Sequence, residues 1–294
     1  MFDGLRRLRT HVADELFHHE SPAADAPLAL QWLGTAGFRV VGAGHHIWLD
    51  PHLSRHSLAE VAFGRIAPRP EAIARDVDIC HAVMVGHSHF DHAIDTPWIA
   101  REHGARVYGA EDTLNCCRGF GVDEDQLVLL EPGRPFTEGP FALRGYRSQH
   151  SAFAFGRVPA PGRIEAPLQT PARAWDWRVG EVLGLHLDHP LASIYHVGSA
   201  DLIEAEIEGV RADVVLCCTI GRHATERFTE RVIDALQPRL LIPCHWDQFW
   251  RPLDAPPRQI PSNDLEGFLD EVRRHPRAPE VRVLPPRGWT RLSA

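Results

Sequence analysis

Four potential metal ligands lie within six consecutive residues of this 294-residue chain. Residues 87–92 read H-S-H-F-D-H, which places imidazoles at His87, His89 and His92 and a carboxylate at Asp91. Imidazole nitrogen combined with carboxylate oxygen suits zinc and the neighbouring divalent first-row metals. Two imidazoles two residues apart can bind one ion, while the carboxylate and the last imidazole face a second. The segment therefore predicts a metal centre around which the loop must curl.

The elements that position this loop follow from the hydrophobic pattern. An apolar run at 79–85 ends at Gly86, directly before the motif, and predicts a buried strand. Upstream, three short β-like runs at 28–33, 37–41 and 45–49 are separated by glycine-containing turns and predict a meander. The motif is therefore expected at the end of a strand.

Further short strands are interspersed with helices downstream of the motif. Helices are expected at 96–104, 111–118, 225–236 and 264–274. Strands are expected at 105–109, 126–130, 141–146, 193–197, 214–218, 240–243 and 281–284. This mixture predicts a layered α/β protein.

Two segments differ from this pattern. Residues 1–20 place apolar side chains three or four apart, which predicts an amphipathic helix packed on the body, with a membrane-surface helix as the alternative. Residues 151–185 are rich in Pro, Gly and Arg without a clear period, which is typical of a functional loop or lid. We therefore expect a helix and linker at 1–27 and a single domain at 28–294 that carries this insert.

The composition is that of an ordinary globular protein, with 44% hydrophobic residues, 24% charged residues and a net charge of −8. No apolar run approaches the roughly 20 residues that span a bilayer, and the sequence starts without a signal-peptide pattern, so we expect a cytoplasmic protein. All 31 basic residues are arginine, and the acidic balance argues against a nucleic-acid partner. The six cysteines form no C-x-x-C pair, so the sequence indicates neither a zinc finger nor a disulfide framework.

The segment at 87–92 resembles the H-x-H-x-D-H motif of the metallo-β-lactamase fold superfamily. The surrounding sequence is most similar to its branch of simple hydrolases that includes ascorbate-6-phosphate lactonase and N-acylphosphatidylethanolamine phospholipase D. Residues 32–38, which read W-L-G-T-A-G-F, and the Asp50-Pro51 pair resemble the opening hairpin of that branch. The resemblance extends over about 28–254, and it implies an α/β fold, a four-layer αββα sandwich, with a dinuclear metal site along one edge.

The resemblance also implies a ligand set. It assigns Asp91 and His92 to the second metal. It assigns His87 and His89 to the first metal, together with a histidine that follows a downstream strand, His150. The last expected ligand follows a late strand and is His245. Asp247, two residues further on, is a candidate hydrogen-bond acceptor that orients His245.

The bridging carboxylate departs from the family pattern. The family usually has Gly-Asp after a strand, whereas residues 195–201 read Y-H-V-G-S-A-D, so that Ser199 occupies the ligand position and Asp201 comes two residues later. Either the loop is reshaped so that Asp201 bridges the metals, or the second metal is weakened and one metal suffices. We favour Asp201, because a carboxylate offsets the charge of two cations and a hydroxyl does not.

The chemistry that such a site supports is hydrolysis. A metal pair lowers the pKa of bound water, the resulting hydroxide attacks a carbonyl or a phosphorus, and the metals stabilise the oxyanion. By the family pattern, Asp91 orients the nucleophile or accepts its proton. Arg222 can clamp a phosphate or carboxylate and His223 can donate a proton, although an ordinary surface position is an equal alternative for both. Trp175 and Trp177 of the insert can cover an apolar substrate.

We therefore expect a hydrolase of a small-molecule ester, lactone or phosphodiester, with one or two Zn²⁺ per chain and Mn²⁺ or iron as alternative metals. The superfamily also contains a sulfur dioxygenase and flavin di-iron proteins, so an iron-dependent redox enzyme is a second hypothesis. RNA processing, which some relatives perform, is a third, and the acidic balance argues against it. Ser199 allows a fourth, a degenerate metal-binding protein without catalysis.

Overall fold

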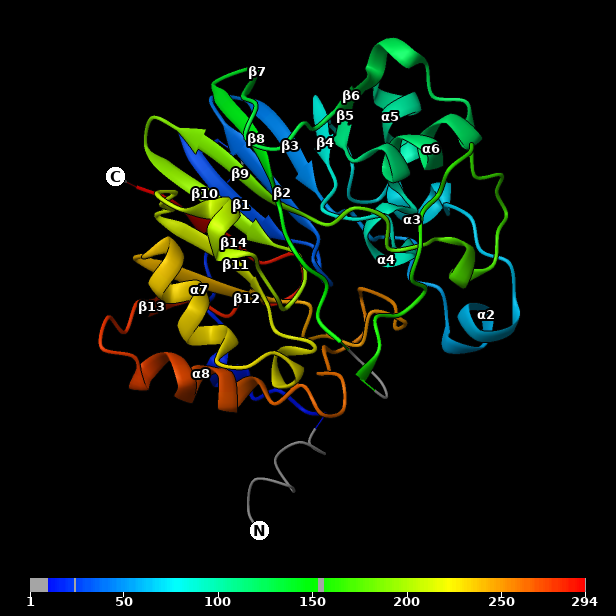
Figure 1. Ribbon diagram of the computed structural model, residues 1–294. Coiled ribbons are helices and arrows are strands. Elements are labelled where there is room, and N and C mark those ends of the chain that lie inside the picture. Colours follow the sequence, from blue (N-terminus) through cyan, green and yellow to red (C-terminus); the bar gives the residue numbers. More distant parts are fainter. Residues whose placement is uncertain (1–9, 24, 153–155, 294) are drawn as a thin grey trace.

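Two β-sheets lie face to face, and helices cover the outer side of each (Figure 1). The computed structural model describes residues 10–23, 25–152 and 156–293. The helices over the first sheet are α5 (Thr96–His103) and α6 (Glu111–Phe120), and those over the second are α7 (Phe228–Leu236) and α8 (Leu265–Arg274). The layers run helix, sheet, sheet, helix, which confirms the predicted αββα sandwich.

The first sheet has the strand order β14-β1-β2-β3-β4-β5-β6. Its strands are β1 (Leu28–Trp32), β2 (Phe38–Gly42), β3 (His45–Leu49), β4 (Ala82–Met84), β5 (Arg106–Gly109), β6 (Leu127–Leu129) and β14 (Trp289–Arg291). Strands from β14 to β3 pair antiparallel, as the predicted meander requires, and those from β3 to β6 pair parallel. In register, Leu49 of β3 pairs with Met84 of β4. The loops after these two parallel strands therefore start side by side.

The second sheet repeats this scheme, with the order β13-β12-β11-β10-β9-β8-β7. Its strands are β7 (Phe136–Glu138), β8 (Phe141–Arg147), β9 (Leu183–His189), β10 (Ala192–Val197), β11 (Val214–Cys218), β12 (Leu240–Cys244) and β13 (Glu280–Val281). Strands β7 to β10 pair antiparallel, and strands β10 to β13 pair parallel. Parallel strands end at one edge of a sheet, so the loops after β10, β11 and β12 gather there.

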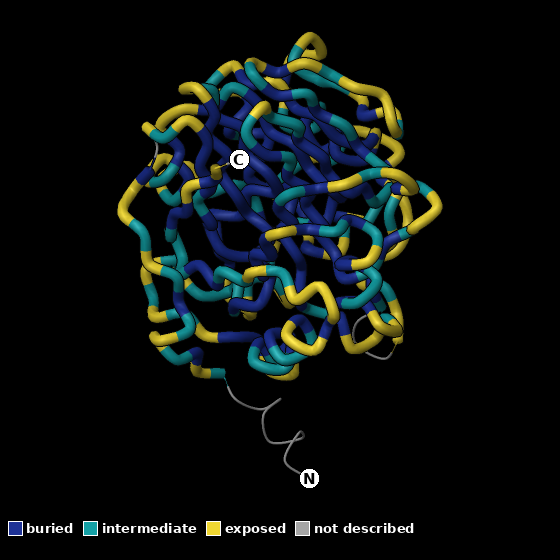
Figure 2. The backbone as a smooth tube through the Cα atoms, turned by 90° about the vertical axis from the view of Figure 1, so that its left-hand side faces the viewer, coloured by how far each residue is buried: buried dark blue, intermediate teal, exposed yellow. Residues whose placement is uncertain are grey.

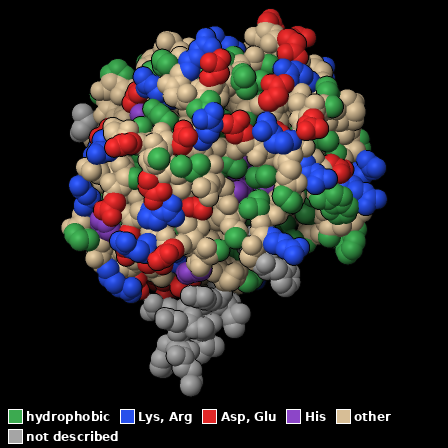
Figure 3. Space-filling view, viewed as in Figure 1, with side chains coloured by type: hydrophobic (Ala, Val, Ile, Leu, Met, Phe, Trp, Pro, Cys, Tyr) green, Lys and Arg blue, Asp and Glu red, His purple; other side chains and the backbone are tan. Residues whose placement is uncertain are grey.

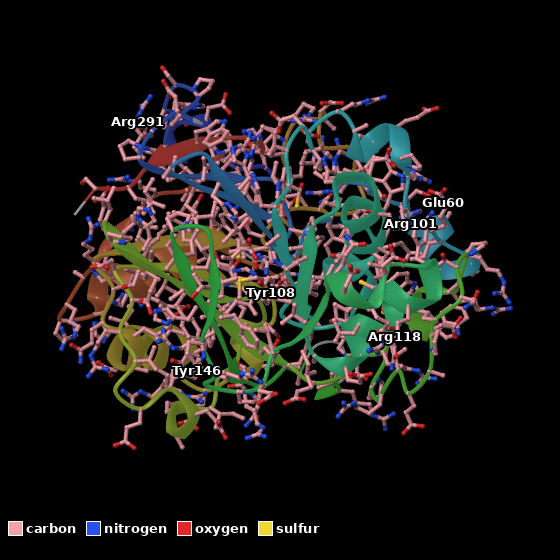
Figure 4. All side chains as sticks on the ribbon, turned by 90° about the horizontal axis from the view of Figure 1, so that it is seen from above. Glu60, Arg101, Tyr108, Arg118, Tyr146 and Arg291 are labelled. Carbon is pink, nitrogen blue, oxygen red and sulfur yellow. The ribbon has the colours of Figure 1, made fainter. Side chains whose placement is uncertain are left out.

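The main core fills the space between the sheets, where the interior in Figure 2 is almost entirely buried. Apolar side chains from both sheets meet in it, among them Leu30, Leu187 and Ile242. Tyr108 of β5 lies near the middle of the molecule in Figure 4, and its hydroxyl donates to Glu138 of β7 at 2.7 Å. This bond joins the two sheets inside the core, while the ends of the parallel strands remain available for chemistry.

Local signals explain where several helices begin and end. Helix α5 ends at Gly104, whose φ of +62° is accessible to glycine at little cost. The short helix α2 (Leu58–Phe63) starts at a capping box, in which Ser57 and Glu60 satisfy each other's backbone donors. Helix α3 (Pro70–Ile73) has proline at its first position. The pattern at 58–78 was too mixed to predict these two helices. No helix among the described residues is long and apolar enough to cross a membrane.

The structure describes only part of the predicted N-terminal helix. Residues 1–9 of the expected amphipathic helix lie outside the described residues. The described part is not an α-helix: it holds a 3-10 turn at Asp14–Leu16, and single bridges join His11 to Arg258 and Phe17 to Val283. The apolar side chains of Val12 and Phe17 are buried by these pairings, because the extended chain lies against the body.

The insert ends earlier than expected, because β9 begins at Leu183. Its described residues form irregular chain with a 3-10 turn at Ala174–Asp176, and they pack on α6. The amide of Ile164 donates to the Asp112 carboxylate at 2.6 Å, and the Asn115 side chain donates to the Ile164 carbonyl at 2.7 Å. The insert is therefore tied to the helix layer.

Candidate metal centre

The motif occupies the turn between β4 and the short helix α4 (Phe90–Ala93). The amide of His92 donates to the His89 carbonyl at 3.0 Å, which closes the first helical turn directly at the motif. His87 and His89 thus lie on the loop, whereas Asp91 and His92 lie on the helix. The change from extended loop to helix separates four nearby ligands into two pairs.

The first triad consists of His87, His89 and His150, whose candidate ligand atoms all lie within 4.8 Å of one another. His150 arrives from the segment after β8, as expected. The Nε2 of His87 lies 3.0 Å from the Nδ1 of His89. Hydrogen bonds occupy the other nitrogen of two rings, because His89 Nε2 contacts the Pro159 carbonyl at 2.9 Å and His150 Nδ1 contacts the Ser151 carbonyl at 2.8 Å. The remaining nitrogens face the common centre.

The first triad favours neutral imidazoles. Burial, together with neighbouring imidazoles, lowers the pKa of His89 to about 4 and that of His150 to about 3. Burial also holds the pKa of His87 well below its usual value. Three neutral imidazoles with nitrogens turned toward one point leave lone pairs that a divalent cation satisfies. The residues present therefore fit a metal ion.

The second triad consists of Asp91, His92 and His245, all buried, with ligand atoms again within 4.8 Å of one another. His245 follows β12 in a left-handed conformation with a φ of +57°, and its amide donates to the Thr35 carbonyl at 2.7 Å. Its Nε2 lies 3.2 Å from the Asp91 carboxylate. Burial alone would raise the pKa of Asp91, but His92 and His245 outweigh it and hold this pKa well below its usual value. The carboxylate is therefore ionised and available as a ligand.

Asp50 is the most important residue that sequence reasoning left without a role. It is fully buried after β3, and its carboxylate contacts His92 Nδ1 at 2.8 Å and His196 Nε2 at 2.9 Å. Burial would raise the pKa of Asp50, but the two imidazoles outweigh it and lower this pKa. The contact directs His92 Nε2 toward the second triad. Its sequence signals were its place at a strand end and the resemblance of the Asp50-Pro51 pair to the opening hairpin of the family.

The structure differs from the prediction at the bridging position. The Asp201 carboxylate pairs with Arg231 at 3.1 Å, and it belongs to neither triad of the described residues. Ser199 instead lines the cavity in front of the triads, and its hydroxyl accepts from the Ser151 amide at 3.1 Å. The loop after β10 therefore presents a hydroxyl, because Arg231 of α7 draws the carboxylate to the surface.

The predicted substrate residues Arg222 and His223 also lie elsewhere. The Arg222 guanidinium is buried against the carbonyls of Asn263 and Asp264 and contacts Glu271 at 3.4 Å. His223 is exposed, and neither residue lines the cavity. Ile220 of the loop after β11 still lines the cavity, but after the left-handed turn at Gly221 the Arg222 side chain is directed toward α8. The structure thus gives Arg222 a packing role.

The two tryptophans of the insert lie in different surroundings. Trp175 lines the cavity and is 42% exposed, as a substrate cover would be. Trp177 is wholly buried in a second core cluster and does not line the cavity, so the structure does not support its predicted contact with substrate. Trp175 lies in the 3-10 turn at Ala174–Asp176 and Trp177 directly follows it; at about three residues per turn, side chains two residues apart point in different directions, which explains the difference.

Asp247 acts through the backbone rather than on the ring of His245. Its carboxylate accepts from Arg55 Nη1 at 2.7 Å and from the Thr35 amide at 2.7 Å. The Thr35 carbonyl in turn accepts from the amide of His245. The buried ion pair therefore positions the loop that holds His245. The His245 Nδ1 atom is buried with no hydrogen-bond partner among the described residues.

Both triads open into one cavity of about 510 Å³. Its wall is formed by α2, the insert, and the loops after β10, β11 and β12. A model of the β-lactamase superfamily domain matches residues 29–245, which spans both triads and most of the chain. The chain belongs to the metallo-β-lactamase superfamily.

Curated relatives of this superfamily member carry the name UPF0173 metal-dependent hydrolase. The protein from Brucella ovis is 34% identical over 238 residues, covering 76% of this chain and 85% of the relative. The protein from Methylobacterium nodulans is 25% identical over 245 residues, covering 82% of this chain and 93% of the relative. The chain therefore spans most of the length of these relatives.

Solved structures share the fold at low sequence identity. Igni18, a metallo hydrolase from Ignicoccus hospitalis, has a TM-score of 0.56 and 15% identity, covering 90% of this chain and 97% of that one. CmlA, a diiron β-hydroxylase from Streptomyces venezuelae, has a TM-score of 0.59 and 14% identity, covering 90% and 54%. An isothiocyanate hydrolase from Delia radicum gut bacteria has a TM-score of 0.56 and 15% identity, covering 90% and 100%.

Proposed function

We propose that this chain is a hydrolase in which two divalent ions, one in each triad, activate water for attack on a carboxylic ester, a lactone or a phosphodiester. The observation that carries the proposal is the convergence of two three-ligand groups on one cavity. The names of the curated relatives support the same class of reaction.

Zinc fits the two ligand sets best. Imidazole and carboxylate ligands in sets of three are typical of catalytic zinc, which keeps a position for water or substrate. Manganese and iron accept similar ligands, so they are the alternatives that metal analysis must separate. When bound, such ions lower the pKa of coordinated water toward neutrality and stabilise negative charge on a substrate oxygen.

The chain's own residues orient the ligands and handle the proton. Asp50 holds His92 through Nδ1, and the Pro159 carbonyl holds His89 through Nε2, so each ring presents its other nitrogen to the centre. Asp91 is ionised at the cavity wall and can accept the proton of the attacking water. The apolar wall keeps bulk water away from the reacting atoms.

Ser199 makes the two metal sites less strongly linked than a bridging carboxylate would. A hydroxyl at this position offsets no positive charge, so the two ions repel each other without compensation between them. We therefore expect the two ions to bind with different affinities, and partly loaded protein to contain about one ion per chain at low metal concentration.

The test combines metal analysis with hydrolysis assays. Protein purified without chelator should contain zinc, hydrolyse 4-nitrophenyl acetate or bis(4-nitrophenyl) phosphate, lose this activity to a chelator, and regain it with Zn²⁺. His89→Ala should reduce turnover at least about thousandfold, because the ion supplies several kcal/mol of barrier lowering. His103→Ala, at the end of α5 and absent from the cavity wall, is the control.

Two outcomes would contradict the proposal. Unchanged hydrolysis by metal-free protein would remove the metal from the reaction. Iron in the purified protein, together with oxygen uptake and no hydrolysis, would favour the redox hypothesis.

A further inference from the structure

The cavity in front of the triads has an almost wholly apolar wall. Its polar side chains are those of the triads and two serines, Ser151 and Ser199, and the other described lining residues are apolar or glycine. None of the described lining residues is arginine, and the chain contains no lysine. The cavity therefore offers the reacting group its metal ligands and offers the rest of the substrate an apolar surface.

This wall disfavours a charged group on the part of the substrate that enters the cavity. An anion taken out of water requires a paired cation or several donors, and an apolar wall supplies neither. Arg222 was the candidate clamp for such an anion, but its guanidinium is turned to the carbonyls of Asn263 and Asp264. A neutral apolar group loses no such interactions and is stabilised by leaving water.

The apolar surface continues from the cavity to the outside. Leu58 of α2 and Trp175 of the insert both line the cavity, and they are 54% and 42% exposed. Val61, one turn along α2 from Leu58, also lines the cavity and is partly buried. Figure 3 shows hydrophobic side chains gathered over α2. An extended chain can therefore run from the reacting group to the surface along apolar contacts.

We infer that the ester, lactone or phosphodiester group of the substrate carries an uncharged alkyl or aryl chain, and that this chain occupies the cavity between α2 and the insert. The inference rests on the proposed function, and it specifies the chain rather than the reacting group, because metal ions in the triads would offset the charge of a phosphodiester. With a carboxylic ester or lactone, the reaction adds water across the acyl C–O bond: the C–O bond breaks, the acyl carbon gains the hydroxyl, and the leaving oxygen gains the proton.

A series of 4-nitrophenyl esters from acetate to decanoate tests whether the cavity binds the acyl chain of the substrate. We expect kcat/KM to rise about two- to fourfold with each added methylene until the cavity is full, because each buried methylene is transferred out of water. A matched ester with a terminal carboxylate on a six-carbon acyl chain should react at least about tenfold more slowly than its neutral counterpart. A flat series, or preference for the carboxylate-terminated ester, would overturn the inference.

Two variants on α2 distinguish the contribution of the cavity wall from that of the exposed helix surface. Leu58→Ser should reduce the gain in kcat/KM with chain length, because Leu58 lines the part of the cavity that we assign to the chain. Phe63→Ser is the matched control, since Phe63 lies on the same helix, is 90% exposed and does not line the cavity. An equal effect of both substitutions would show that the surface of α2, and not the cavity, recruits the substrate.

A binding assay keeps this inference distinct from the proposed function. In His89→Ala protein, which cannot turn over, decanol should displace the neutral dye N-phenyl-1-naphthylamine and hexanol should do so more weakly. Chain-dependent displacement without hydrolysis by the wild-type protein would refute the proposed function and retain the apolar site. Hydrolysis without chain-dependent displacement would retain the function and refute the apolar site.

Discussion

The two triads use similar ligands but depend on different parts of the molecule. In the first triad, His89 bonds to the carbonyl of Pro159, which belongs to the insert. In the second, His92 bonds to Asp50, which is fully buried at the end of β3. The first site therefore depends on a surface segment, and the second depends on the core of the sandwich.

The triads also differ in charge. The first contains three imidazoles that burial keeps neutral, whereas the second contains the ionised Asp91 and is backed by Asp50. An ion in the second triad would be offset by the Asp91 carboxylate, with Asp50 behind His92, whereas an ion in the first would rely on nitrogen donors. The two triads of one centre therefore differ both in charge and in the part of the fold that supports them.

Removing one ligand from each triad gives the largest expected effect. His150→Ala should remove the first ion and His245→Ala the second, and each substitution should lower turnover at least about thousandfold. Elemental analysis together with ester hydrolysis checks both. Retention of two ions per chain in either variant would show that the triads are not separate sites.

Asp50→Asn should weaken the second site selectively. An amide no longer balances the imidazole of His92, and loss of such a partner typically costs about 10- to 100-fold in metal affinity. Competition with a chromophoric chelator measures the two affinities. Equal weakening of the first site would contradict the assignment of Asp50 to the second.

Ser199→Asp should restore the carboxylate that the loop after β10 does not present. We expect the weaker ion to bind roughly tenfold more tightly, because a negative charge then lies near both cations. Asp201→Asn is the comparison, because the Asp201 carboxylate pairs with Arg231, and its metal content should match that of the unmodified protein. If instead Asp201→Asn loses an ion, Asp201 is the bridging ligand after all.

Gly180→Ala should give the smallest effect, limited to the first site. A Cβ there would lie 2.5 Å from Asp112 and 2.7 Å from the Ser88 hydroxyl, so the insert must shift. We expect a few-fold weaker first ion and an unchanged second. Gly162→Ala is the control, because its φ is also positive but the nearest atom lies 4.0 Å away. Similar losses in both variants would indicate backbone strain rather than displacement of the insert.

The motif at 87–92 could be recognised because its signal is local, whereas the αββα fold and the grouping of His150 and His245 with the motif were expectations from the family resemblance. The motif at 87–92 lies after a strand, and His150 and His245 each follow a strand in the same way. Glycine at 104 and the alternation of strands with helices likewise mark element ends within a few residues. Short-range patterns of this kind can be recognised without knowledge of the tertiary structure.

The remaining parts depend on contacts between distant residues. Asp50 lies 42 residues before His92, and Arg231 lies 30 residues after Asp201, so no spacing reveals either pairing. The direction of Arg222 depends on the turn at Gly221 and on carbonyls about 40 residues later. The sequence and the family resemblance indicated the residues of the two triads, but the hydrogen-bond partners that orient them required the structure.

Anomalous X-ray scattering at the zinc edge, from crystals of protein purified without chelator and supplied with Zn²⁺, tests the central claim most directly. The account predicts two anomalous peaks per chain, one within the His87–His89–His150 triad and one within the Asp91–His92–His245 triad. A chain without a peak in either triad, or with its zinc bound elsewhere, would contradict it.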